Sequence, residues 1–112
     1  MPFEDLEVWK RSRTLSAEIY RYFANHGDFG FRDQITRSGL SPPSNISEGY
    51  ERNSNRDMIR FLAYAKGSLG ELRTQIDIGR EIGYIDEDTA SRWLSEAREL
   101  SRMIYSLINA RS

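Results

Sequence analysis

The chain has 112 residues, with 16 basic and 17 acidic side chains and no cysteine. This length gives one domain whose core folds without a disulfide or a metal, and the lack of cysteine excludes disulfides, thiol catalysis and thiolate metal sites. The formal net charge of −1 gives the whole chain no general attraction for nucleic acid. Because no apolar run resembles a signal peptide or a membrane span, we expect a cytoplasmic protein without a membrane partner.

Apolar residues recur at helical spacing in four segments. These segments are separated by turns that are rich in Gly, Asp, Asn and Pro. The first segment covers about residues 5–25. Its main stripe consists of Val8, Leu15, Ile19 and Tyr22. No segment shows the strict alternation that a half-buried strand requires.

The second segment, about 31–51, keeps the helical spacing, although most residues on its stripe are small or polar. Pro42 and Pro43 remove two helical N–H donors and crowd the preceding turn, where Gly39 adds no side chain. Alternatively, Ser41 caps a new helix that has Pro42 at its first position. A loop here would leave one quadrant of a bundle empty. We therefore expect a helix that is kinked near residue 42, and the sequence leaves open whether the prolines break it.

The third and fourth segments have the clearest helical patterns. In the third segment, about 55–82, apolar residues follow one another at intervals of alternately four and three positions. Ser54 precedes the segment and is a candidate N-cap. These residues are Met58, Leu62, Ala65, Leu69, Leu72 and Ile76. The fourth segment, about 87–109, repeats the rhythm behind Asp86 as the expected N-cap. The sequence therefore predicts one all-α domain over residues 1–112, an up-down-up-down antiparallel four-helix bundle.

Four short segments carry a family resemblance: FEDLEVW (3–9), NISEG (45–49), RFLAYAKGSLGEL (60–72) and GYI (83–85). From Phe3 to about Ile108, the chain resembles the four-helix-bundle proteins encoded by intervening sequences in bacterial 23S ribosomal RNA genes. These proteins are related to the accessory variability protein of diversity-generating retroelements. The resemblance implies a four-helix protomer in a homopentameric ring with a central channel. It also suggests a link to RNA or DNA, because the retroelement protein is basic and binds nucleic acid and the reverse transcriptase.

Candidate catalytic and metal-binding residues lack the partners that such sites need. Glu48 and Glu71 are carboxylates of the type that bundles use for di-metal centres, but His26 is the single histidine and lies in the first turn. No G-x-S-x-G elbow accompanies the serines, and GSLG (67–70) lacks the phosphate-loop pattern. We predict no enzyme activity, no metal and no cofactor. The polar residues of the motif segments are instead interpreted as a structural motif that fixes helix register, namely Asn45, Glu48, Gly49, Ser68 and Glu71.

Basic side chains give the remaining functional lead. One candidate set is spaced four residues apart (Arg52, Arg56, Arg60) and another seven apart (Lys66, Arg73, Arg80), so each set is expected to line one face. Either set suits a nucleic-acid phosphate backbone. The alternative is a solvated face with ion pairs four residues apart, such as Arg73 with Asp77 and Glu48 with Arg52. In a symmetric ring, five copies of one stripe would form a basic belt.

Aromatic side chains are too numerous for one bundle seam, and they occupy more than one face of the first and third helices. Such a surplus suits an oligomer interface, with core filling as the alternative for several of them. We predict a non-enzymatic homo-oligomer, expected to be a pentamer, that binds RNA or DNA through a basic face. The alternative is a protein-interaction scaffold that binds another protein and no nucleic acid.

Overall fold

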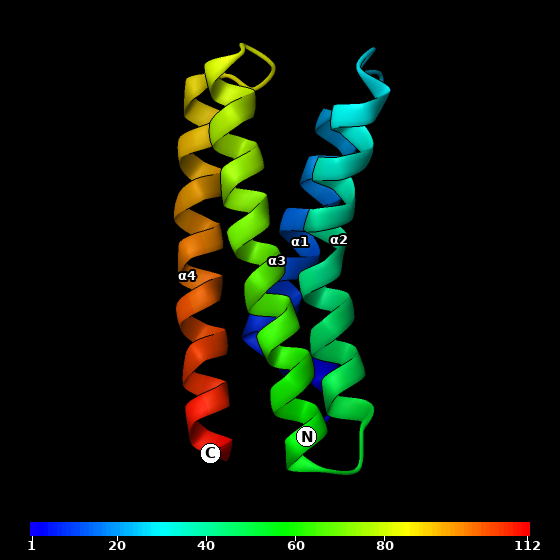
Figure 1. Cartoon of the computed structure of the whole chain (residues 1–112), viewed down its shortest axis with the longest axis vertical. Coiled ribbons are helices and arrows are strands. Elements are labelled where there is room, and N and C mark those ends of the chain that lie inside the picture. The colour runs from blue at the N-terminus through cyan, green and yellow to red at the C-terminus, as the bar shows by residue number, and fades with distance from the viewer.

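The computed structural model describes residues 1–112 as a short 3₁₀ turn and four α-helices. Their bounds are η1 Phe3–Asp5, α1 Glu7–Tyr22, α2 Phe29–Glu51, α3 Asn55–Glu81 and α4 Glu87–Arg111. Consecutive helices run antiparallel in an elongated bundle that measures 42 × 21 × 20 Å (Figure 1). The predicted all-α four-helix bundle is confirmed. None of the helices combines the length and the apolar character that crossing a membrane requires.

The helix starts follow from side-chain caps. Ser54 accepts a hydrogen bond from the N–H of Asp57 at 3.1 Å, and Asp86 accepts one from Thr89 at 2.8 Å, as predicted. Asp28 caps α2 in the same way, through Phe31 at 3.0 Å, and α2 therefore begins two residues earlier than expected. The first helix is shorter than expected, because the backbone of Leu6 is extended before Glu7.

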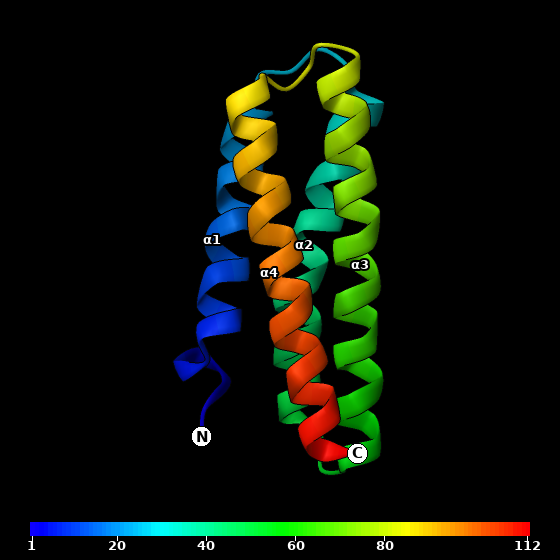
Figure 2. The ribbon, with the colours of Figure 1, turned by 90° about the vertical axis from the view of Figure 1, so that its left-hand side faces the viewer.

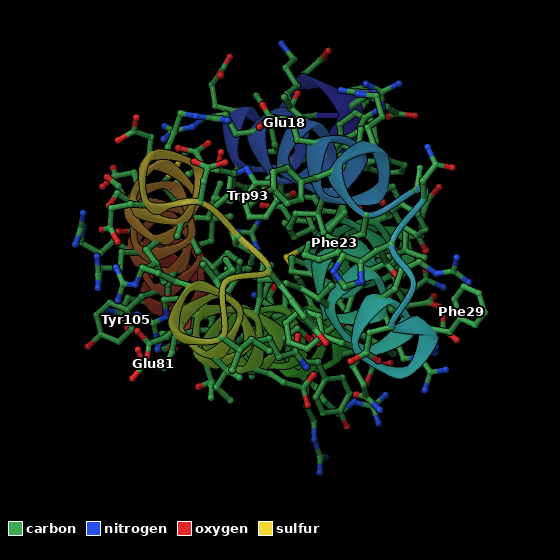
Figure 3. The ribbon with its side chains drawn as sticks, turned by 90° about the horizontal axis from the view of Figure 1, so that it is seen from above. Glu18, Phe23, Phe29, Glu81, Trp93 and Tyr105 are labelled. Carbon is green, nitrogen blue, oxygen red and sulfur yellow. The ribbon has the colours of Figure 1, made fainter.

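The core lies along the axis of the bundle and contains 18 buried hydrophobic residues. The predicted seam of α3 is buried from Leu62 to Ile76, and only Met58 lies partly exposed at its edge. Phe23 and Trp93 point into the bundle, whereas Phe29 and Tyr105 point away from it (Figure 3). The packing of α3 thus agrees with its sequence pattern.

The second helix continues without a break through both prolines, so the prolines do not end it. Pro42 and Pro43 are buried, and two glycines let neighbouring helices approach. A Cβ at Gly39 would lie 3.2 Å from Ile19 Cδ1, and one at Gly49 would lie 3.2 Å from the carbonyl oxygen of Met58. The small residues of this segment therefore allow α1 and α3 to pack closely against α2.

The α1–α2 and α3–α4 loops lie at one end of the bundle, opposite both termini (Figure 2). Two tyrosine–aspartate pairs join these loops. Tyr84 Oη donates a hydrogen bond to Asp28 at 2.9 Å, and Tyr22 Oη donates to the Asp86 carboxylate at 3.2 Å. Each aspartate therefore caps its own helix and also binds a tyrosine of the other helical hairpin, Tyr84 in the α3–α4 loop or Tyr22 at the end of α1. This contact also explains why Tyr22 is exposed, although it continues the stripe of Val8 and Ile19.

Candidate nucleic-acid interface

A ladder of polar side chains joins α2 to α3. Ser38 Oγ donates to Glu71 Oε1 at 2.7 Å, and Ser41 Oγ lies 2.5 Å from Ser68 Oγ. Asn45 Nδ2 donates to the carbonyl oxygen and to Oγ of Ser41 at 3.0 and 2.8 Å. The contact that lies later in α2 lies earlier in α3, as antiparallel helices require. The ladder therefore fixes the register of the two helices.

This ladder contains part of the predicted polar motif. Asn45, Ser68 and Glu71 belong to it, and Gly49 provides the close approach to α3. Glu48 does not belong, because it is exposed and forms the predicted ion pair with Arg52, at 3.3 Å. Ser38 and Ser41 were not among the predicted motif residues, and Ser41 was considered only as a helix cap. Their signal is their spacing, since residues 38, 41 and 45 recur on one face of a helix.

Polar side chains between α1 and α4 are also paired with one another. Arg11 holds Glu96 through Nε and Nη2, at 3.0 and 2.6 Å. Glu18 accepts from Arg92 Nη1 at 2.7 Å and from Trp93 Nε1 at 3.2 Å. The hydrogen bond from Arg92 is the main reason why the pKa of Glu18 is lowered. These groups hold α1 against α4.

His26 is engaged within its own turn. Its Nδ1 accepts a hydrogen bond from the N–H of Asp28 at 3.1 Å, and its ring packs edge-on against Tyr84 at 4.4 Å between centroids. No group of three histidine, aspartate or glutamate side chains is arranged to hold a metal. These contacts assign His26 a structural position in the loops at this end of the bundle.

The arginine set at the α2–α3 turn is largely engaged within the chain. Arg60 pairs with Asp57 at 3.4 Å, as Arg52 does with Glu48. Both guanidinium groups also lie over the ring of Phe61, at 4.7 Å for Arg52 and 5.0 Å for Arg60. Arg56 is exposed and forms no ion pair. Only one of these three cations is thus unpaired at the surface.

The second basic set follows the flank of α3 that faces α4. Arg80 pairs with Asp77 at 2.6 Å and with Glu87 of α4 at 3.5 Å. The alternative pair of Arg73 with Asp77 is wrong, because Asp77 binds Arg80 instead. Lys66 and Arg73 form no ion pair, and Nε of Arg73 is buried without a hydrogen-bond acceptor. Lys66 and Arg73 are therefore the unpaired cations of this set.

Arg98 of α4 extends this basic flank and was missed by sequence analysis. It lines a cavity of about 330 Å³ together with Arg73 and Arg80. Tyr105, which is 56% exposed, follows seven residues later on α4. It points outward beside α3 and α4 (Figure 3). We call Lys66, Arg73, Arg80, Arg98 and Tyr105 the α3/α4 basic face.

The two predicted basic sets do not merge into one surface. Lys66 lies six positions after Arg60, which places the two sets about 120° apart around α3. The first set lies at the α2–α3 turn, and the second lies along the α3/α4 boundary. The α3/α4 basic face is the stronger candidate for binding a polyanion, because more of its cations lack a carboxylate partner.

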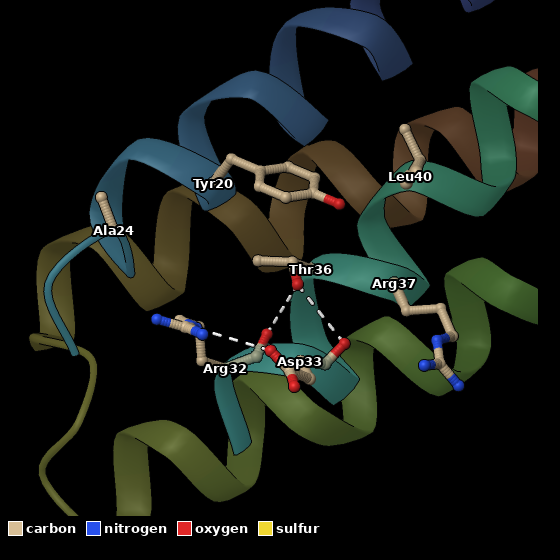
Figure 4. A pocket seen from close by; sticks show the side chains of 7 residues that line it. All are labelled: Tyr20, Ala24, Arg32, Asp33, Thr36, Arg37 and Leu40. Atoms are coloured by element: carbon tan, nitrogen blue, oxygen red, sulfur yellow. Dashed lines mark hydrogen bonds and ion pairs between the residues drawn. The ribbon is translucent and has the colours of Figure 1, made fainter. Parts of the chain in front are cut away.

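A separate groove runs between α1 and α2. Tyr20 and Leu40, which are 45% and 47% exposed, line two adjoining cavities of about 480 and 520 Å³. Figure 4 shows the first cavity, where Thr36 donates to the carbonyl oxygen of Arg32 at 2.7 Å. Basic residues surround both cavities, with Asp33 as the carboxylate among them. They are Arg13, Arg21, Arg32 and Arg37. The groove is therefore apolar at its centre and basic at its rim.

Comparison with known proteins places this geometry in context. Residues 4–106 match the model of the 23S rRNA-intervening sequence protein family. The chain is also similar to a crystal structure from Bacteroides thetaiotaomicron VPI-5482, described as a protein with unknown function from the S23 ribosomal protein family. The two are 25% identical with a TM-score of 0.85, over 90% of this chain and 97% of that chain. No curated protein matches the chain.

Proposed function

Since the chain belongs to the 23S rRNA-intervening sequence protein family, we propose that it is a non-enzymatic homo-oligomer that binds RNA or DNA through the α3/α4 basic face. The observation that carries this proposal is that three cations of this face, Lys66, Arg73 and Arg98, have no carboxylate partner. Such cations can release counterions from a phosphate backbone without first breaking an ion pair. Tyr105 beside them offers a ring on which an unpaired base can stack.

The proposal includes a ring of five copies and a relation to the accessory variability protein of diversity-generating retroelements, both expected from the sequence resemblance. A ring repeats the basic face five times, so a belt of positive charge arises although one protomer is nearly neutral. On this proposal the belt attracts the polyanion, although the net charge of each chain is −1.

The contact between copies is assigned to the groove between α1 and α2. Its basic rim is complementary to the C-terminal part of α3, where Glu81 lies beside Ile78 and Ile82, which are exposed. A groove on one copy that binds a different surface of the next gives a head-to-tail contact, and such contacts form a ring when the rotation between successive copies closes on itself. Leu40→Arg places a charged side chain in the apolar centre of the groove, and the groove remains positively charged. We expect this variant to be monomeric in light scattering, whereas the control Tyr64→Ser remains oligomeric.

Fluorescence anisotropy with labelled structured RNA and duplex DNA tests nucleic-acid binding. We expect micromolar or tighter binding at low salt that weakens steeply as salt rises, with a slope that counts the phosphates contacted. The triple variant Lys66→Gln, Arg73→Gln, Arg98→Gln should lose this binding. Arg102→Gln is the matched control, because Arg102 already pairs with Glu99 at 2.8 Å. Absence of binding at low salt, with the oligomer intact, would refute the proposal.

The second candidate function is a protein-interaction scaffold, which the exposed Tyr20 and Leu40 in the α1/α2 groove favour. In this case the groove binds an acidic amphipathic helix of another protein rather than a second copy. The same two measurements separate the candidates. A scaffold remains monomeric at the concentrations of light scattering and binds no nucleic acid, with the groove free for its partner.

A further inference from the structure

The cavity between α3 and α4 brings three arginines together on a small surface. Arg73 and Arg80 come from α3, Arg98 comes from α4, and the volume between them is about 330 Å³. Leu94 lines the cavity and is buried, while Gly70 adds no side chain that would fill it. The cavity is thus basic at its edges and partly apolar at its base.

Arg73 is one of two residues with a buried polar side-chain atom that has no hydrogen-bond partner; the other is Gln75. The Nε of Arg73 is buried, and no protein atom accepts a hydrogen bond from it. A Cβ built on Gly70 would lie 3.8 Å from Nη2 of Arg73, so the guanidinium group folds back over this glycine. A buried donor without an acceptor is unfavourable, and the cost is larger when the group is charged. Because Nε is buried, an anion in the open cavity meets the part of the Arg73 side chain that lines the cavity rather than Nε itself.

The other charges of the cavity favour an anion. Arg98 forms no ion pair, whereas Asp77, the one carboxylate that lines the cavity, is held by Arg80 at 2.6 Å. Guanidinium groups bind tetrahedral oxyanions through paired N–H donors, which is why arginine predominates in phosphate sites. Two unpaired guanidinium groups on facing helices provide such donors from two directions.

We propose that this cavity binds a single phosphoryl group, with Arg73 and Arg98 as its principal donors and Arg80 as an additional cation. The inference deepens the proposed function by naming the point where one phosphate is anchored on the α3/α4 basic face. A phosphodiester of a nucleic-acid backbone and a phosphate monoester or free phosphate share this chemistry. The cavity accepts one phosphoryl group, and the neighbouring Lys66 and Tyr105 contact what is attached to it.

Side-chain NMR tests the site directly, since the Nε–H group of each arginine gives its own signal. We expect inorganic phosphate, added at constant ionic strength against chloride, to shift the signals of Arg73 and Arg98 along a saturable curve. The signal of Arg102 should not follow this curve. Shifts that stay linear, or that are equal at all arginines, would show only a diffuse ion atmosphere and would overturn the site.

Two substitutions at one position separate geometry from charge. Arg73→Gln should weaken phosphate binding at least tenfold, as read from the Arg98 signal, and backbone amide spectra confirm that the variant is folded. Arg73→Lys keeps the charge but loses the planar guanidinium group with its paired N–H donors, and we expect most of the loss to remain. Wild-type affinity in Arg73→Lys would mean that charge alone is responsible and would overturn the proposed donor. Arg102→Gln is the control and should change the affinity less than twofold.

Oligonucleotides with and without a 5′-phosphate distinguish the sources of the phosphoryl group. If an oligonucleotide without a terminal phosphate shifts Arg73 and Arg98, the backbone phosphodiester occupies the cavity. If only inorganic phosphate and the 5′-phosphorylated oligonucleotide shift them, the site is selective for monoesters, and backbone binding at this face fails while the cavity stands. If anisotropy detects nucleic-acid binding but neither signal moves, the cavity proposal fails while the proposed function stands.

Discussion

Replacement of Gly79 by alanine tests the glycine position with the least room for a side chain. A Cβ at this position would lie 2.6 Å from Cδ1 and 3.0 Å from Cγ1 of Ile85, and 3.1 Å from Cζ of Phe31. Ile85 is 2% exposed, and its N–H donates to the carbonyl oxygen of Gly79 at 3.1 Å. Ile85 is therefore fixed both by its backbone hydrogen bond and by the surrounding core, and its side chain has little room to move aside.

The expected magnitude follows from two opposing effects. Alanine in place of glycine favours a helix by about 1 kcal/mol, whereas overpacking of a core costs about 1–3 kcal/mol. Gly79→Ala should therefore lower the free energy of unfolding by about 1 kcal/mol. Gly67→Ala is the matched control on the same helix, because a Cβ there meets no atom within 4 Å. The control should gain about 1 kcal/mol.

Urea unfolding of both variants at one protein concentration measures the difference. A gap of about 2 kcal/mol corresponds to midpoints about 1 M apart for a domain of this size. The double variant Gly79→Ala, Ile85→Val removes the atom nearest to the new Cβ. It should therefore be more stable than the sum of the two single changes predicts. If Gly79→Ala stabilised the protein as much as Gly67→Ala, the close approach of Ile85 would be refuted.

Three further substitutions test polar contacts. Ser38→Ala removes the hydrogen bond to Glu71 and should cost about 1 kcal/mol in urea unfolding; an unchanged midpoint would contradict the structural reading of the ladder. The pKa of Glu18 lies below its ordinary value of 4.5 in the folded chain, mainly because of the hydrogen bond from Arg92. Its contribution to stability is thus present above pH 4.5 and is lost as the pH falls through the lower, folded pKa. Glu18→Gln should show a flatter decline in unfolding midpoint over this acidic range than the wild type, and parallel curves would refute this. The pKa of Asp28 is lowered first by the N–H of Phe31 and then by the hydroxyl of Tyr84. Tyr84→Phe should raise it toward 3.8, as followed by carboxyl carbon NMR, whereas Tyr64→Phe should leave it unchanged.

The sequence was most informative where the spacing of apolar residues within one helix is enough to predict which face is buried. The seam of α3 could be predicted because Leu62, Leu69 and Ile76 are large, apolar and regularly spaced. The packing of the second helix was harder to predict, since Gly39 and Gly49 have no side chains and contribute by letting α1 and α3 approach closely. Its start was also misplaced, because Asp28 lies in a turn where several residues can cap a helix.

The candidate site could be predicted only in part, because its pairings depend on side chains from different helices. Asp77 lies four residues after Arg73 and three before Arg80, and both spacings permit an ion pair. The structure selects Arg80, which Glu87 of α4 also contacts. Arg98 could not be assigned to the same surface, since the rotation of α4 relative to α3 is set by the packing of the whole core.

The unbroken course of α2 through Pro42 and Pro43 has a consequence for local opening of the chain. Neither proline has an N–H, so the carbonyls of Ser38 and Gly39 lose the hydrogen bond that the residue four positions later would donate. The backbone ladder of α2 is therefore interrupted at its middle, although the helix itself is continuous. The segment from Ser44 to Glu51 is too short to persist as an isolated helix. Its amide protons then depend on packing against neighbouring segments for protection from hydrogen exchange, and we expect the two halves of α2 to exchange as separate units.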